Sequence, residues 1–171
     1  MKTDFIEENG AYAFDCSTAV WATDQMHHDY QTAKIHIKDT DLLIENDTNI
    51  LMVEYKNANL AGVAKPDTFE PESDKKISDV FHKFYDSLPY LYLLDKDKPV
   101  QFIYVLEYPN GDIVTRKRLR NRLMNEFPFE LQKKIGHGKK LIDKVDVVSI
   151  QEWNDHEIYG EYPVKPVHKE M

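Results

Sequence analysis

Residues 40–57, TDLLIENDTNILMVEYKN, decide the fold because they hold two apolar runs separated by a polar turn. The first run follows Asp41, and the second ends in Glu54-Tyr55-Lys56. Asn and Asp residues between the runs are typical of a turn, so we expect two antiparallel strands. Strand side chains alternate between faces, which places Glu54 and Lys56 on one face and Tyr55 on the other. Pairing of the two strands brings Asp41 close to them.

This arrangement of side chains has a chemical use. Two neighbouring carboxylates repel each other, and Mg²⁺ typically takes one or two carboxylates together with waters and substrate phosphate oxygens. A lysine beside them can orient a metal-bound water or stabilise negative charge on a phosphate. A metal-dependent phosphodiester hydrolase needs these groups. The alternative is a solvated Glu-Lys ion pair at a strand end, which is worth little.

Asp41, a short gap and Glu54-x-Lys56 at the end of an apolar strand resemble the PD-(D/E)XK signature of the restriction-endonuclease-like nucleases. Thr40 stands where the signature has Pro, at a position that varies widely in that superfamily. The resemblance covers residues 34–107 and implies a core of helix, three antiparallel strands, helix and strand.

The resemblance also implies roles for single residues. Asp41 and Glu54 would be metal ligands, Lys56 the catalytic lysine, and the carbonyl of Tyr55 a further metal ligand. The implied cofactor is Mg²⁺, with Mn²⁺ as a substitute. The implied activity is hydrolysis of DNA phosphodiester bonds by an endonuclease, although RNA as a substrate shares the same site. Many superfamily members are dimers, so a homodimer is compatible with the resemblance.

Two alternatives for the metal ligands stay open. Asp39 is the rival of Asp41, which we prefer because it leads directly into the apolar run. The superfamily often supplies a further acid from its leading helix, for which Glu7 and Glu8 are candidates. Both are also typical surface acids.

The expected fold is a single α/β domain over residues 1–171, with a restriction-endonuclease-like mixed sheet of about five strands flanked by helices. Apolar spacing predicts a helix over residues 75–94, capped by Ser73 or Asp74 and kinked or divided at Pro89. The run VQFIYVL predicts a central strand buried on both faces. In the first half we expect a leading helix at 4–12, a short strand or a helical turn at 19–23, a strand at 33–38 and a loop at 57–73 that leaves the site. In the second half we expect a helix at 115–127 with Thr115 as N-cap, a short helix after Pro128, a strand at 141–150, and, over 153–171, a short helix or turn followed by an extended tail.

The charge of the chain is unevenly distributed. The net charge is −8, yet residues 116–144 hold ten Lys or Arg and three acids, which gives +7 there and −15 elsewhere. A basic segment on an acidic body can attract a polyanion to one face. We therefore expect DNA backbone contacts from Lys76, Arg116, Lys117 and Arg120, unless these side chains only solvate helix surfaces. The alternative function is a catalytically silent nuclease-fold module that binds a protein through its acidic face.

The remaining sequence features predict a cytoplasmic protein. The first ten residues are acidic and do not resemble a signal peptide, and no apolar run has the length of a membrane span. The single cysteine, Cys16, excludes an internal disulfide and suits a reducing compartment. We expect Cys16 to be a packed or surface residue rather than a nucleophile.

Overall fold

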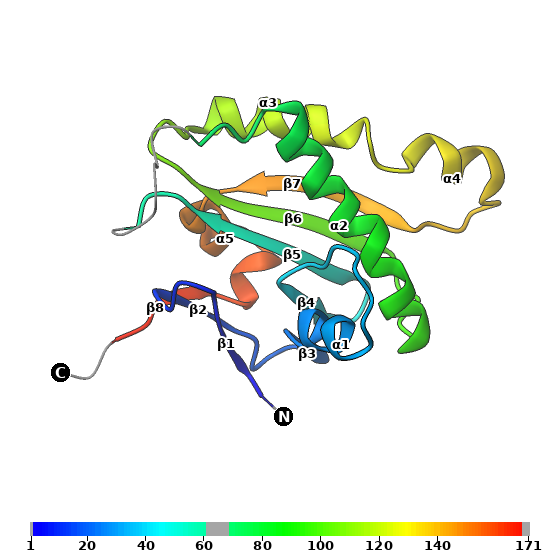
Figure 1. Ribbon diagram of the computed structural model, residues 1–171, viewed down its shortest axis with the longest axis horizontal. Helices are drawn as coiled ribbons and strands as arrows, with labels where there is room; N and C mark the ends of the chain where they lie inside the picture. Colours follow the sequence, from blue (N-terminus) through cyan, green and yellow to red (C-terminus); the bar gives the residue numbers. More distant parts are fainter. Residues whose placement is uncertain (1, 61–68, 169–171) are drawn as a thin grey trace.

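The computed structural model describes residues 2–60 and 69–168. A five-stranded mixed sheet crosses the middle of the molecule in the order β3-β4-β5-β6-β7 (Figure 1). Its strands are β3 (Trp21–Thr23), β4 (Leu42–Glu45), β5 (Ile50–Asn57), β6 (Val100–Glu107) and β7 (Ile142–Val148). The first three are antiparallel, and β5, β6 and β7 are parallel. The structure confirms the expected α/β class and the mixed sheet.

One face of this sheet is covered by helices (Figure 1). The long helix α2 (Asp74–Leu93) connects the parallel strands β5 and β6, and α3 (Ile113–Met124) and α4 (Phe129–Ile135) connect β6 to β7. Short α1 (Met26–Thr32) precedes β4. Alternate residues of β5 such as Met52 pack with Phe84 of α2 and Leu119 of α3 in one hydrophobic core. Glu54 belongs to the same face of β5, so the core positions it beneath α2.

The other face of the sheet is covered by the chain termini. A three-stranded sheet of β1 (Asp4–Ile6), β2 (Tyr12–Asp15) and β8 (Val164–Pro166) lies there with α5 (Ile150–Asp155) and the 3₁₀ helix η2 (Tyr159–Glu161). Phe14 and Trp153 meet edge to face, with ring centroids 5.4 Å apart, over Val53 and Ile103 of the large sheet. Two cores on opposite faces of one sheet therefore tie the whole described chain together.

Three expectations about the first half of the core are wrong. Residues 4–12 form β1, a turn and the start of β2 rather than a helix, and Gly10 has the positive φ of 71° that this turn requires. Residues 33–38 are irregular because β3 occupies the free edge of β4, which leaves Ile35 and Ile37 exposed. The third antiparallel strand is thus β3, which precedes α1, and the three antiparallel strands do not follow a leading helix as the resemblance implies.

The second half follows the expectation more closely. Helix α2 runs unbroken through Pro89, and Ser73 caps it by accepting a hydrogen bond from the Lys76 N–H at 3.3 Å. Strand β6 is buried on both faces as predicted. The N-cap of α3 is Asp112, not Thr115, because the two residues form a reciprocal capping box.

The expected tail is part of the folded domain as far as the structure describes it. Trp153, Tyr159, Tyr162 and Val164 are buried, and β8 pairs with β2. Of the expected loop at 57–73, residues 61–68 lie outside the described residues. Within residues 2–60 and 69–168, no helix combines the length and apolar character needed to cross a membrane.

Candidate metal centre

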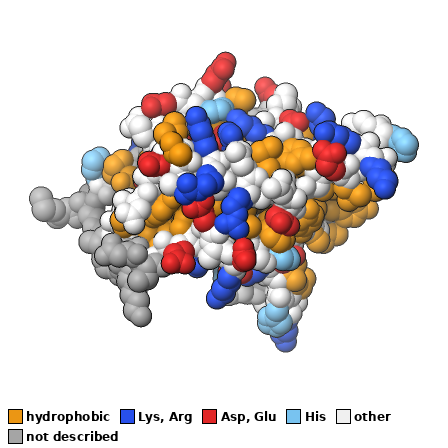
Figure 2. Space-filling model, turned by 90° about the horizontal axis from the view of Figure 1, so that it is seen from above, with side chains coloured by type: hydrophobic (Ala, Val, Ile, Leu, Met, Phe, Trp, Pro, Cys, Tyr) orange, Lys and Arg blue, Asp and Glu red, His pale blue; other side chains and the backbone are white. Residues whose placement is uncertain are grey.

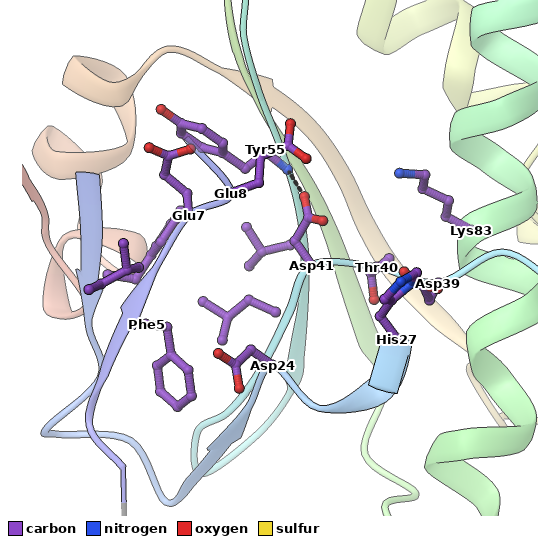
Figure 3. A pocket seen from close by; sticks show the side chains of 14 residues that line it. Phe5, Glu7, Glu8, Asp24, His27, Asp39, Thr40, Asp41, Tyr55 and Lys83 are labelled. Carbon is purple, nitrogen blue, oxygen red and sulfur yellow. Dashed lines mark hydrogen bonds and ion pairs between the residues drawn. The ribbon is translucent and has the colours of Figure 1, made fainter. Parts of the chain in front are cut away.

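Asp41 lies at the point where β4 begins, directly beside β5. Its N–H donates to the carbonyl of Val53 at 3.1 Å, and its Oδ2 accepts a hydrogen bond from the Tyr55 N–H at 2.8 Å (Figure 3). Leu42 pairs with Val53, so the antiparallel register continues to Asp41 opposite Glu54. The hairpin therefore brings Asp41, Glu54 and Tyr55 together, as the sequence predicts.

Glu54 is a buried carboxylate with only one of its oxygens occupied. The residue is 7% exposed, and Lys83 donates a hydrogen bond to Oε1. Oε2 is buried without a hydrogen-bond partner among the described residues. Burial, followed by the charge of Asp41, raises the pKa of Glu54 to about 8, although Lys83 acts in the opposite direction. The pKa of Asp41 is also raised, chiefly because the surrounding protein desolvates its carboxylate, although the residue as a whole is exposed at the cavity. The positive charge of Lys83 is therefore not enough to hold both carboxyl groups in the ionised form.

Lys83 is a site residue that our sequence analysis did not identify. It projects from α2 toward Asp41 at the start of β4 and Tyr55 on β5 (Figure 3). Burial acts to lower the pKa of Lys83, but the Glu54 carboxylate outweighs it and the pKa is raised. The available signal was its helical position, three residues after buried Val80 and four before buried Ser87, which places a lysine on the apolar face of α2.

Lys56 is placed differently. It is half-buried on β5, two residues beyond Glu54, and its side chain forms no hydrogen bond or ion pair with any residue that the structure describes. It faces the same side of the sheet as Glu54, as expected. The structure therefore brings Lys83, rather than Lys56, into contact with the buried carboxylate.

A cavity of about 430 Å³ opens beside Asp41, and its lining is acidic (Figure 3). Three acids around Asp41 have partners. Glu7 accepts hydrogen bonds from the backbone N–H groups of Asn9, Ala11 and Tyr12, Asp24 pairs with Lys2, and Asp39 lies 2.8 Å from His27 Nδ1. Asp41 accepts only the Tyr55 N–H, and Glu8, whose charge contributes to raising the pKa of Asp41, has no side-chain partner among the described residues. The His27 pair therefore supports Asp41 over Asp39, and the three hydrogen bonds on Glu7 support Glu8 over Glu7, as candidate ligands.

Two further buried groups surround the carboxylates. The Thr40 hydroxyl lines the cavity and has no hydrogen-bond partner among the described residues. Tyr104 of β6 lies in register with Glu54. Burial, then the charges of Glu54 and Asp41, raises the pKa of the Tyr104 phenol. The phenol therefore stays neutral beside the acids.

The residues present fit a Mg²⁺ ion. Within residues 2–60 and 69–168, no group of three or more His, Cys, Asp or Glu side chains is arranged to hold a metal. Mg²⁺ does not need such a group, because it retains several waters and is often held by one or two carboxylates. Asp41 and the orphaned Oε2 of Glu54 supply this number. A buried polar atom without a partner is costly, and an ion bound there would remove that cost.

The basic segment is largely paired with acids. Arg116 is buried and binds Glu152, Arg118 forms two hydrogen bonds with Glu72, and Arg122 pairs with Asp74. Arg116 is therefore not available to DNA, contrary to our expectation. Lys76 and Lys117 are exposed, and Arg120 is half-buried. On the face that carries α3, Figure 2 shows basic side chains interspersed with acidic ones.

Cys16 is buried, and burial raises the pKa of its thiol to about 12. A thiol with that pKa is inert at neutral pH, so Cys16 is a packing residue as expected.

Comparison with protein-family models, with curated proteins and with solved structures finds no match to this chain.

Proposed function

We propose that the protein is a Mg²⁺-dependent nuclease that hydrolyses DNA phosphodiester bonds, with Asp41 and Glu54 as the metal ligands. The observation that carries the proposal is Glu54 Oε2, a buried carboxylate oxygen that has no hydrogen-bond partner among residues 2–60 and 69–168 and lies beside the Asp41 carboxylate. Asp41 would offer the oxygen that does not accept from Tyr55, and Glu8 lies at the same cavity. The carbonyl of Tyr55 remains a candidate ligand from the resemblance.

A bound Mg²⁺ would lower the pKa of a coordinated water and stabilise charge on the phosphate. The protein's own groups hold the surrounding geometry. The Tyr55 N–H fixes the Asp41 carboxylate, and Lys83 fixes Glu54 through Oε1 while leaving Oε2 open. Lys56 lies at the carboxyl end of β5, where it would orient a water or a phosphate oxygen. Lys76, Lys117 and Arg120 are the remaining candidates for the DNA backbone.

The alternative function is a catalytically silent module of the same fold that binds a protein. It is favoured by the Lys83–Glu54 pair, which provides a cation without any metal, and by the pairing of Arg116, Arg118 and Arg122 with acids. An acidic cavity also repels DNA when no metal is bound.

Isothermal titration with Mg²⁺ and Mn²⁺ distinguishes the two functions. We expect wild type to bind metal and Glu54→Gln to lose at least about 100-fold in affinity, because the ligand charge is removed while the shape is kept. Glu45→Gln is the matched control, since Glu45 is equally buried on the same hairpin and lies away from the cavity.

Incubation with plasmid and with single-stranded DNA follows the titration. We expect Mg²⁺-dependent cleavage by wild type and Glu45→Gln and none by Glu54→Gln or Asp41→Asn. Undiminished cleavage by Glu54→Gln would refute the assignment of the site. Absence of metal binding in wild type would refute the nuclease proposal and leave the silent module.

A further inference from the structure

An open groove lies at the end of the molecule opposite the carboxyl end of β5. Its volume is about 940 Å³, and its walls are the last turns of α2 and the helix α4. Tyr92, Leu131, Ile135 and Leu141 line it with exposed fractions of 82%, 54%, 60% and 50%. Figure 2 shows hydrophobic side chains gathered at the end of the molecule that carries α4. Large apolar side chains exposed together in a concave surface mark an interaction site.

The groove is separate from the candidate metal centre. Val100, the first residue of β6, lies in its floor, whereas Glu54 is near the carboxyl end of the neighbouring strand β5. The two cavities have no lining residue in common. A substitution of a groove residue therefore does not replace any side chain that lines the cavity of the candidate metal centre.

The charges around the groove indicate the kind of partner. Residues 128–144, which include α4, hold five lysines and two acids, so they carry +3 while the rest of the chain carries −11. Lys139 and Lys140 line the α4 side. Lys96 and Lys98 line the other side but are bound to Glu45. Lys140 lies 3.5 Å from Asp143 in an exposed ion pair, which is worth little, so Lys139 and Lys140 can still attract acidic groups of a partner.

Two other occupants suit these features less well. A symmetric contact between two copies would set the +3 segments against each other. An anionic membrane would meet Asp95 and Asp97 on the α2 side, and a flat lipid surface does not fill a concave groove. An amphipathic helix suits both the concave shape and the positive charge of the groove. Its apolar ridge would enter the groove, and its flanking acids would face the lysines.

We propose that the groove between α2 and α4 binds an amphipathic helix of another protein, with acidic residues along the edge of its apolar ridge that faces Lys139 and Lys140. Apolar anchors at positions i, i+3, i+4 and i+7 of that helix would contact Leu131, Ile135 and Tyr92. This interaction does not depend on metal binding or on DNA cleavage.

Fluorescence anisotropy with a labelled synthetic helix of about 20 residues tests the proposal. The probe has Leu at the ridge positions and Glu on the flanks, and the control probe has Lys in place of Glu. We expect the acidic probe to bind with a dissociation constant on the order of 10 µM and the basic probe at least about 10-fold more weakly. Ile135→Asp should weaken binding of the acidic probe by at least about 10-fold.

The control variant is Val114→Asp, which introduces the same charge at an exposed apolar residue of α3 outside the groove. It should bind the acidic probe as wild type does. Equal binding of both probes, or no loss in Ile135→Asp, would overturn the proposal. So would sedimentation showing a dimer that Ile135→Asp dissociates, or binding to phosphatidylserine vesicles that the same variant abolishes.

Discussion

The β4–β5 hairpin contains two buried glutamates that experience opposite electrostatic environments. Glu45 and Glu54 are each 7% exposed. Glu45 binds Lys96 and Lys98 at 2.5 and 2.9 Å, and although burial acts to raise its pKa, the two lysines lower it. Glu54 has one lysine, a neighbouring carboxylate and one oxygen without a partner in the described part of the chain, and its pKa is raised to about 8.

The difference shows how burial alone fails to identify a site. A buried carboxylate with all its charge compensated stabilises the fold, whereas one beside a second carboxylate is poised to bind a cation. Glu45 thus has a structural role at one end of the hairpin, and Glu54 marks the candidate site at the other.

The largest change in the free energy of unfolding is expected when one lysine is removed at either end of the β4–β5 hairpin. Lys83→Met should lower the free energy of unfolding by about 3 kcal/mol at pH 8 without metal, because Glu54 loses its only cation. Lys96→Met should cost less, because Lys98 remains on Glu45. Urea denaturation measures both values.

Addition of Mg²⁺ sharpens the same experiment. The ion should restore much of the stability of Lys83→Met by binding to the folded state, and should leave the deficit of Lys96→Met unchanged. Equal recovery of the two variants would show that the metal acts elsewhere.

The pH dependence of stability should also separate the two glutamates. The folded protein keeps a proton on Glu54 up to about pH 8, whereas the unfolded chain releases it near the ordinary value of 4.5. The folded state therefore binds more protons between these values, and without metal its unfolding free energy should fall, by about 3 to 4 kcal/mol, as the pH rises from about 5 to 8.

Glu54→Gln should remove this decline. The lowered pKa of Glu45 has the opposite sign, so its contribution is present above its ordinary value and is lost as the pH falls through its folded pKa. Glu45→Gln should therefore alter only the acidic limb. Chemical denaturation at a series of pH values measures these slopes, and an unaltered decline in Glu54→Gln would contradict the assignment.

The smallest effect on stability is expected from the second lysine of the site. Lys56→Ala should change the free energy of unfolding by no more than about 0.5 kcal/mol, since Lys56 has no ion-pair partner among the described residues. Metal affinity should stay at the wild-type level while DNA cleavage is lost. Wild-type cleavage by Lys56→Ala, with loss in Lys83→Met, would move the catalytic role to Lys83.

The sequence predicted the hairpin and the placement of Asp41 and Glu54 correctly, because strand alternation and antiparallel pairing are local rules. It also predicted helix α2 and the buried strand β6 from periodicity and length. It did not predict β1 or β8, and it left residues 19–23, which contain β3, open between a short strand and a helical turn; each of these three strands is three residues long. So short a segment carries little periodicity, and its strand conformation depends on the partner that it pairs with.

The sequence by itself therefore determined which carboxylates meet at the end of the hairpin. Only the tertiary structure decided which lysines pair with the glutamates of the hairpin. Lys83 is 29 positions from Glu54 along the chain, and Lys96 is 51 positions from Glu45. The same reason removed Arg116 from the predicted DNA contacts, since its partner Glu152 is 36 positions distant. Ion pairs between distant residues depend on how helices pack on the sheet, and no local pattern specifies that packing.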